Sequence, residues 1–176
     1  MRRATSQEAL YRFTVPSPVG EIVCLSRHDR ILGLAFPGRL QLLEKLSHNA
    51  EVLIQPVEEL RCVLQEHLNQ PKQDPNLFST LPVELLGSDF QKKVWLELVK
   101  IPWGETRSYS ELAITVGKGV HPRAVARAVA LNPILILIPC HRVISKSGEL
   151  SGYSGGVEKK RQLLEWEQKN LPTKRS

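Results

Sequence analysis

One short segment of the sequence is so apolar that we expect it to be buried in the folded protein. It is the aliphatic run Ile134–Ile138, enclosed between Asn132-Pro133 and Pro139. The run is far shorter than the roughly 20 apolar residues that cross a membrane, and its β-branched composition and flanking prolines are typical of a buried strand. The sequence therefore predicts a strand over Ile134–Ile138, with Cys140 directly after its end.

The first half of the chain contains runs that alternate with turn-like segments. The strand-like runs are Tyr11–Val15, Glu21–Leu25 and Ile31–Phe36. They predict an antiparallel meander. Helices are expected around Leu40–Ser47 and over Val57–Asn69, where apolar residues recur at helical spacing. The stretch Pro71–Pro82, rich in Pro, Asn, Asp and Ser, is interpreted as a linker.

The second half is divided into helices by start and stop residues. The predicted helices are Phe90–Lys100, Tyr109–Val116, Pro122–Leu131 and Val157–Lys169. Capping-box pairs, Ser88 with Gln91 and Ser108 with Glu111, precede the first two of them. Gly117 is interpreted as a left-handed helix stop. The middle two helices, with the glycine-containing turn between them, form a candidate helix-turn-helix.

These elements predict two units. Residues 1–86 form an N-terminal α/β domain, an antiparallel sheet with helices and the linker, and residues 87–176 form a mainly α, winged-helix-like domain with the helix-turn-helix. Residues 1–86 carry nine Lys+Arg and ten Asp+Glu, whereas residues 87–176 carry 15 and eight, so the net charge of +6 arises from the second half. A basic half favours a polyanionic partner, and a lysine-rich solvated surface is an equally good reading.

Cysteine usage and the lack of targeting segments indicate a reducing compartment. Cys24, Cys62 and Cys140 are too few and too scattered for a disulfide framework. No secretory signal or membrane span is present in the sequence, so we expect a cytoplasmic, nucleoid-associated protein (nuclear if the source is eukaryotic). Since His28 and His67 lie near isolated cysteines and not within a ligand cluster, no metal site is expected.

Two segments could carry chemistry. Gly152–Gly156 matches the G-x-S-x-G pattern around Ser154, but a hydrolase of that type needs a histidine after the serine, and the last histidine is His141. A flexible glycine turn is the alternative. Cys140 precedes His141 and Arg142, and a nearby base or cation favours the reactive thiolate. Because neighbours in an extended segment point to opposite sides, His141 would act through a water. An inert buried cysteine is the other reading.

The predicted helix Pro122–Leu131 offers only Arg123 and Arg127 among alanines and valines. The two arginines lie four residues apart and share a face. Small residues with two cations suit close approach to a nucleic-acid backbone with weak sequence preference. An ordinary amphipathic packing helix is the alternative.

In combination, these motifs resemble the O6-alkylguanine-DNA alkyltransferases, also called methylated-DNA–protein-cysteine methyltransferases. The matching motifs are Arg123-Ala124-Val125, Asn132-Pro133, Ile138–Val143 and Gly152–Gly156, in the family's order and spacing. The resemblance covers about half of the chain, from Phe90 to Glu167, and the first half fits in architecture only. It implies a single-turnover protein that needs no cofactor, acts as a monomer without an obligatory protein partner, and repairs O6-alkylguanine in double-stranded DNA. Activity on O4-alkylthymine is left open.

The resemblance also implies roles for the reacting groups. Cys140 would accept the alkyl group. His141 would act as its base through a bound water, with Glu167 orienting the imidazole. Tyr109 would donate a proton toward N3 of the departing guanine, and Asn132 would tie the DNA-binding helix to the active-site strand.

Further roles concern the base and the DNA. Residues that would bind the base are Ser154 at O6, Val143 at the exocyclic amine, and Tyr153, Gly155 and Gly156 in the pocket. Arg123 would replace the flipped nucleotide in the stack, with Ala124, Arg127 and Tyr109 also on the DNA. Leu135 stands where some members have a proline, which puts tolerance of bulky O6 substituents in doubt.

Typical magnitudes show which of these effects should contribute most to the rate of alkyl transfer. A thiol with an unperturbed pKa near 8.5 is about 7% ionised at pH 7.4, so full ionisation gains about 14-fold. Positioning supplies roughly 7–11 kcal/mol, and protonation of the leaving base about 100-fold or more. Two other classes of protein are kept as alternatives: a DNA-binding module that marks lesions or regulates transcription without chemistry, and a thiol hydrolase.

Overall fold

A four-stranded sheet forms the core of the first half. The structure, a computed structural model, describes residues 9–48, 50–69, 77–150 and 152–171. The strands are β1 (Leu10–Ser17), β2 (Gly20–Arg27), β3 (Arg30–Ala35) and β4 (Val52–Leu53), in the order β3-β2-β1-β4. β1–β2 and β2–β3 are antiparallel, which confirms the meander. The parallel strand β4 was not predicted, because two residues carry no alternation pattern.

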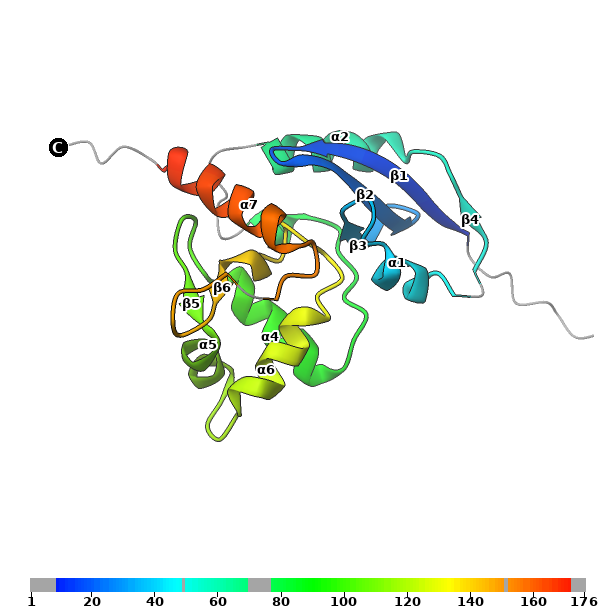
Figure 1. The fold of residues 1–176 in the computed structure, drawn as a ribbon. Helices are drawn as coiled ribbons and strands as arrows, with labels where there is room; N and C mark the ends of the chain where they lie inside the picture. The colour runs from blue at the N-terminus through cyan, green and yellow to red at the C-terminus, as the bar shows by residue number, and fades with distance from the viewer. Residues whose placement is uncertain (1–8, 49, 70–76, 151, 172–176) are drawn as a thin grey trace, which may run out of the picture.

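Helices cover the sheet in the first half (Figure 1). α1 (Gln41–Leu46) and α2 (Glu58–Asn69) match the predicted helices, and α2 packs against β1 with the buried residues Leu60, Leu64 and Leu68. The linker prediction is wrong at its end, where α3 (Leu77–Thr80) forms a short helix. The earlier part of that stretch, residues 71–76, lies outside the described residues.

The second half is mainly helical, as predicted. Its elements are α4 (Asp89–Val99), β5 (Arg107–Ser108), α5 (Tyr109–Val116), α6 (Pro122–Ala130), the 3-10 helix η1 (Cys140–Arg142), β6 (Val143–Ile144) and α7 (Val157–Lys169). Both capping boxes are confirmed: Ser88 and Ser108 accept from the backbone N–H groups of Gln91 and Glu111, whose side chains bond back. Figure 1 shows the helices α4, α5 and α6 below the sheet, with α7 running between the two parts.

The turn between α5 and α6 differs from the prediction at Gly117. This residue ends α5 with φ 160° and ψ 159°, which is extended backbone, so it is not a left-handed stop. The positive φ of the turn lies two residues later, at Gly119 (φ 79°). Glycine is therefore required at Gly119 on backbone grounds, and Gly117 has no such requirement.

A continuous hydrophobic core runs through both halves of the chain. Phe36 of the first half and Trp95 of α4 belong to one cluster of buried side chains. Trp95 also donates from its indole N–H to the carbonyl oxygen of Ala128 in α6 (2.9 Å), which fixes α4 against α6. None of the described helices is long and apolar enough to cross a membrane.

The run Ile134–Ile138 is buried, but it is not a strand. Within this run, only Ile134 forms a β-bridge, to Leu34 of the edge strand β3. The following residues form a turn, with Ile136 at φ 70°. The turn is closed by the hydrogen bond from the Ile138 N–H to the carbonyl oxygen of Ile134 (3.1 Å). The prediction failed because it ignored Asn132, whose side chain supplies the backbone partners that a sheet would otherwise provide.

Candidate active site around Cys140

Asn132 organises the buried turn that leads to Cys140. Its side-chain oxygen accepts from the Ile134 N–H (3.0 Å), and its amide nitrogen donates to the carbonyl oxygen of Ile138 (2.9 Å). The same nitrogen lies 3.0 Å from Cys140 Sγ. One side chain at the end of α6 therefore fixes both ends of the turn and contacts the sulfur.

Cys140 itself begins the 3-10 helix η1. Our prediction of an extended segment at Cys140 and His141 is therefore wrong. Its side chain is buried, with the residue only 3% exposed. Burial raises the pKa of Cys140 to about 11, against the hydrogen bond from Asn132 and the charge of Lys160, which lower it. The resting group is a protonated thiol that ionises less readily than an isolated cysteine.

The neighbouring His141 is held by Glu167 of α7. Nε2 of His141 lies 2.7 Å from Oε1 of Glu167, and both side chains are buried. Burial raises the pKa of Glu167, but the hydrogen bond from His141 and the hydrogen bonds and positive charge of Arg142 outweigh this effect and lower the pKa from 4.5 to about 2. Burial also lowers the pKa of His141, against the stabilising effect of Glu167, so the imidazole is neutral at pH 7. A neutral imidazole facing a carboxylate donates from Nε2–H, which leaves Nδ1 as an acceptor.

The Nδ1 atom of His141 is buried and has no hydrogen-bond partner among the described residues. An imidazole whose far side is fixed by a carboxylate and whose near nitrogen carries a lone pair is arranged to take up a proton. We predicted this pair of residues from the sequence, and the fold brings them into contact.

Sequence reasoning missed the structural role of Arg142. Its guanidinium binds both carboxylate oxygens of Glu167 (2.9–3.1 Å) and donates from Nη1 to the carbonyl oxygen of Ile101 (2.6 Å). The backbone N–H of Gly104 also donates to Glu167 (3.0 Å). These donors immobilise the carboxylate, so that it can present one oxygen to His141 in a fixed direction.

Lys160 of α7 was missed as well. It is fully buried, and its Nζ donates to the carbonyl oxygen of Val143 (2.6 Å). The spacing of α7 carries a signal for it, because Lys160, Leu163 and Glu167 recur at intervals that place them on one helix face. All three are the buried residues of this helix.

Two tyrosines belong to the surroundings of Cys140. Tyr109, the first residue of α5, is half-buried, and Tyr153 is buried with its ring edge-on to that of His141 (6.4 Å between centroids). Burial raises the pKa of both hydroxyl groups, and a negative charge on Cys140 would raise it further. The Tyr153 hydroxyl has no hydrogen-bond partner within the described part of the chain.

The glycine-rich segment 152–156 packs beside these groups. Ser154 Oγ donates to the carbonyl oxygen of Ala130 at the end of α6 (2.7 Å). Gly155 is buried, and a Cβ there would lie 2.5 Å from the Tyr153 ring and 2.8 Å from the Phe36 ring. Gly156 precedes α7 with φ 93°. Glycine at 155 thus permits close packing of the two rings.

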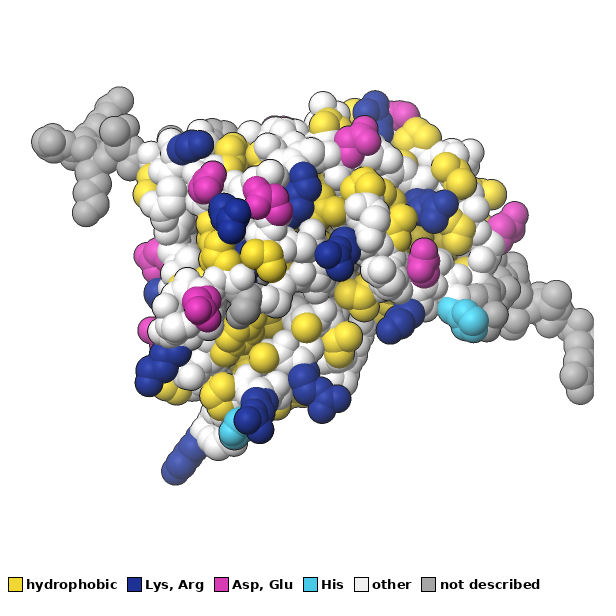
Figure 2. Space-filling view, in the orientation of Figure 1, with side chains coloured by type: hydrophobic (Ala, Val, Ile, Leu, Met, Phe, Trp, Pro, Cys, Tyr) yellow, Lys and Arg dark blue, Asp and Glu magenta, His cyan; other side chains and the backbone are white. Residues whose placement is uncertain are grey.

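Three of the four predicted DNA-contacting residues lie on the outer face of α6, and the fourth, Tyr109, begins α5. Arg123, Ala124 and Arg127 are exposed, whereas Val125 and Val129 are buried against the core. Figure 2 shows Lys and Arg side chains along the lower edge of this face of the molecule, where Figure 1 places α6 and the preceding turn. A basic, thin helix surface is therefore available to a polyanion.

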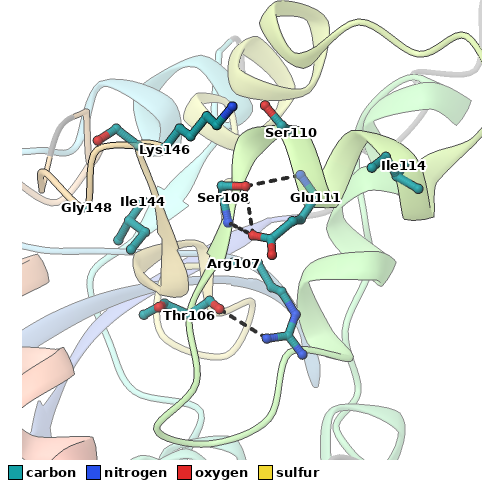
Figure 3. A pocket seen from close by; sticks show the side chains of 10 residues that line it. Thr106, Arg107, Ser108, Ser110, Glu111, Ile114, Ile144, Lys146 and Gly148 are labelled. Carbon is teal, nitrogen blue, oxygen red and sulfur yellow. Dashed lines mark hydrogen bonds between the residues drawn. The ribbon is translucent and has the colours of Figure 1, made fainter.

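A separate surface cleft of about 400 Å³ lies between β5, the start of α5 and the turn after β6 (Figure 3). Its polar lining is largely occupied within the protein, since Glu111 accepts from the backbone and hydroxyl of Ser108 and Arg107 donates to the Thr106 carbonyl. Cys140 does not line it. We assign no ligand to this cleft.

Comparisons with known proteins match both halves of the chain. A family model described as 6-O-methylguanine DNA methyltransferase, DNA binding domain, matches residues 89–169. A methylated-DNA–protein-cysteine methyltransferase of Mycobacterium tuberculosis is 38% identical over 159 residues, covering 90% of this chain and 93% of the relative. An inducible one of Bacillus subtilis is 50% identical over 90 residues, covering 51% and 50%.

Solved structures agree with these matches. The crystal structure of the Mycobacterium tuberculosis O6-methylguanine methyltransferase superposes with a TM-score of 0.74 at 34% identity, covering 93% of this chain and 96% of the other. That of Pyrococcus kodakaraensis gives 0.66 at 30% identity, covering 90% and 98%. The fold and the family model over residues 89–169 identify a protein with a DNA-binding domain, and in this chain that domain holds a buried cysteine beside a histidine–glutamate pair. Within the class of DNA-binding proteins, the chain belongs to the methylated-DNA–protein-cysteine methyltransferase family.

Proposed function

We propose that the protein reverses DNA alkylation directly, by moving an alkyl group, chiefly methyl, from O6 of guanine in duplex DNA to Cys140. The observation that carries the proposal is the chain of contacts behind the sulfur. Asn132 contacts Sγ, and the adjacent His141 is held by Glu167 as a neutral imidazole with an acceptor at Nδ1. These are the parts that a buried thiol needs in order to lose its proton.

The proposed alkyl transfer needs no reactant other than the protein, a water that relays the proton, and the alkylated DNA. The thiol proton of Cys140 passes through a water to Nδ1 of His141, the sulfur attacks the alkyl carbon, and the bond from carbon to O6 breaks. Tyr109 donates a proton to N3 of the departing guanine and is reprotonated at the expense of the imidazolium. The thioether product has no easy hydrolytic exit, so one protein molecule repairs one lesion.

Burial makes thiol ionisation a larger part of this reaction than the sequence suggested. With a pKa of about 11, only about one thiol in several thousand is ionised at pH 7.4 in the resting protein. Ionisation coupled to the His141–Glu167 pair can therefore contribute a factor of about 10³ or more, where an unperturbed thiol offers about 14-fold.

The base would be recognised by groups that are already occupied in the free protein. The hydroxyl of Ser154 donates to Ala130, so it would turn to O6 when the base enters. The carbonyl oxygen of Val143 accepts from Lys160 and keeps a second lone pair for the exocyclic amine. Tyr153, Gly155 and Gly156 would form the wall of the pocket.

The target base lies inside a duplex, so we propose that it is flipped out, at a cost of a few kcal/mol. Arg123, exposed near the start of α6, would fill the gap in the stack. Arg127 and Ala124 on the same outer face would contact the backbone, and this contact should weaken with added salt. We propose that the protein works in this way as a monomer.

The test is an intact-mass measurement after incubation with duplex DNA that contains O6-methylguanine and, in parallel, with O6-benzylguanine. We expect one methyl group per molecule from the duplex, located on the Cys140 peptide, and none on Cys140→Ser. One benzyl group from O6-benzylguanine would show that the pocket also admits a bulky substituent. Cys62→Ser is the matched control, because Cys62 is the exposed cysteine and its loss should not change uptake. Uptake by the Cys140→Ser protein would refute the assignment.

A second candidate function is favoured by the 3% exposure of Cys140. A sulfur so enclosed suits a protein that binds DNA lesions without chemistry. Such a protein would gain no mass from O6-benzylguanine or from duplex DNA that contains O6-methylguanine, whereas its affinity for alkylated duplex DNA would persist in the Cys140→Ser variant.

A further inference from the structure

A half-buried tryptophan lies over the ion pair that supports His141, and the reaction as proposed gives this tryptophan no task. The ring of Trp103, in the turn between α4 and β5, lies over the guanidinium of Arg142, with 5.5 Å between the guanidinium carbon and the ring centre. This distance is within the range of a cation–π contact. Because Arg142 is buried and Trp103 is partly exposed, the ring forms part of the boundary between the guanidinium and water.

Contacts with α7 hold the Trp103 ring in place. The indole N–H donates to the backbone carbonyl oxygen of Glu167 (3.1 Å), and the ring lies edge-on to that of Trp166, with 4.8 Å between centroids. The next residue, Gly104, donates from its backbone N–H to the Glu167 carboxylate and accepts from the side chain of Gln168. The turn therefore contacts both the backbone and the carboxylate of Glu167, so a shift of the ring would disturb both.

Arg142 links the Trp103 ring to the proton acceptor. Its guanidinium binds both carboxylate oxygens of Glu167, and one of these oxygens, Oε1, lies 2.7 Å from Nε2 of His141. Burial lowers the pKa of His141 and Glu167 raises it, whereas the positive charges of Arg142 and Lys160 lower it again. A guanidinium that turned away into water would therefore leave a more basic imidazole, which stays protonated to higher pH and then accepts no proton.

Other titratable groups act on His141 or on the adjacent sulfur. They are Cys140 itself, Lys160, Tyr109 and Tyr153. Burial raises the pKa of the thiol and of both phenols, so these three groups are uncharged at pH 7. The ammonium group of Lys160 is bound to the backbone carbonyl oxygen of Val143. The charged side chain that Trp103 covers is Arg142, so a change of the tryptophan should act on His141 through the Arg142–Glu167 pair.

We propose that Trp103 is a positioning residue of the alkyl transfer: its ring holds the Arg142 guanidinium on Glu167, and Glu167 thereby keeps His141 ready to accept the thiol proton. The inference rests on the proposed role of Cys140 as acceptor. It adds an outer member to the chain of contacts that runs from Glu167 through His141 to the sulfur. The chemical step is unchanged, because Trp103 acts through Arg142 and Glu167.

The experiment is the pH dependence of methyl transfer from duplex DNA that contains O6-methylguanine, followed by intact mass at saturating DNA between pH 6 and pH 8.5. We expect Trp103→Leu to react about tenfold more slowly than the wild type at pH 6 and within about twofold at pH 8.5, because a more basic imidazole regains its lone pair only as the pH rises. Trp103→Phe keeps an aromatic ring over the guanidinium and should stay within about twofold of the wild type at every pH. Phe90→Leu, which removes an exposed ring of α4, is the matched control and should follow the wild type.

The outcomes separate this inference from the proposed function. If the wild type gains no methyl group, the role of Cys140 fails. If the wild type reacts but Trp103→Leu keeps the wild-type rate, or loses the same factor at every pH, only the role of Trp103 is overturned. A Trp103→Phe variant as slow as Trp103→Leu at pH 6 overturns it as well, because the aromatic ring would then not be the group that holds Arg142.

A measurement on the wild type covers the case in which Trp103→Leu does not fold. The Nε–H of Arg142, observed by ¹H–¹⁵N NMR, should exchange with water at least about a hundredfold more slowly than that of the exposed Arg123. It should also give cross-peaks to the ring protons of Trp103. Exchange as fast as that of Arg123, or a spectrum without these cross-peaks, overturns the inference.

Discussion

The side-chain amide of Asn132 joins the end of α6 to the sulfur of Cys140, with 3.0 Å between Nδ2 and Sγ. Because the same amide group holds the Ile134 N–H and the Ile138 carbonyl, the position of the sulfur depends on the turn that Asn132 closes. The helix that carries the proposed DNA-contacting residues and the acceptor are thus fixed by one side chain.

Asn132→Ala should therefore destabilise the fold as well as slow the reaction. The change leaves the buried Ile134 N–H without its partner, at about 1–3 kcal/mol. The carbonyl oxygen of Ile138 loses the Asn132 amide but keeps the Cys140 N–H (2.7 Å). We expect the free energy of unfolding in urea to fall by about 1–3 kcal/mol. Asn69→Ala, which removes an exposed amide at the end of α2, serves as the control and should cost clearly less.

Glu167 should give the protein a marked loss of stability in acid. Its pKa is about 2 in the folded protein, below its ordinary value of 4.5, so the folded state binds the proton less readily than the unfolded state. This stabilisation, about 3 kcal/mol, is complete above about pH 5 and is lost as the pH falls toward 2. Glu167→Gln should be less stable than the wild type at pH 7 and should show a flatter dependence between pH 5 and pH 2.

The measurement is urea unfolding at a series of pH values, with Glu165→Gln as the matched control. Glu165 lies on the same helix but is exposed, so its loss should leave the acid dependence unchanged. Parallel curves for the wild type and Glu167→Gln would contradict the ion-pair account.

Arg123→Ala separates base flipping from chemistry. The side chain is exposed on α6, away from the sulfur, so its removal should weaken repair of a duplex lesion at least tenfold and leave the reaction with free O6-benzylguanine within about twofold. Lys45→Ala, an exposed cation of α1, controls for the loss of charge. Equal losses on both substrates would count against the flipping role.

The helices of the second half and the pair of His141 and Glu167 could be predicted from the sequence, whereas the geometry of the segment that leads to Cys140 could not. Start and stop residues predicted α4 and α5 to within a residue, because capping is a local interaction. The turn over Ile134–Ile138 was mistaken for a strand, because its backbone partners come from Asn132 and from Leu34, which lies about 100 residues away.

The two buried cationic side chains could not be predicted from the sequence for a similar reason. Arg142 and Lys160 belong to the site through contacts with Glu167 and Val143 that only the fold creates. The division into units at residues 86 and 87 stays a prediction, and the hydrophobic core is continuous across it.

Gly155→Ala tests how closely the first half of the chain must approach the site. A Cβ at this position would lie 2.5 Å from Tyr153 Cε1 and 2.8 Å from Phe36 Cδ2, and both rings are buried. Overpacking of this kind costs about 1–3 kcal/mol and should move the Tyr153 ring, which lies edge-on to the His141 ring. We therefore expect a lower free energy of unfolding together with slower benzyl transfer.

Gly117→Ala is the matched control. The backbone of Gly117 is extended, and the nearest atoms to an added Cβ lie at 3.6 Å. The free energy of unfolding of this variant should therefore change by less than about 0.5 kcal/mol. Equal stabilities of the two variants would show that the Phe36–Gly155–Tyr153 contact does not constrain the site.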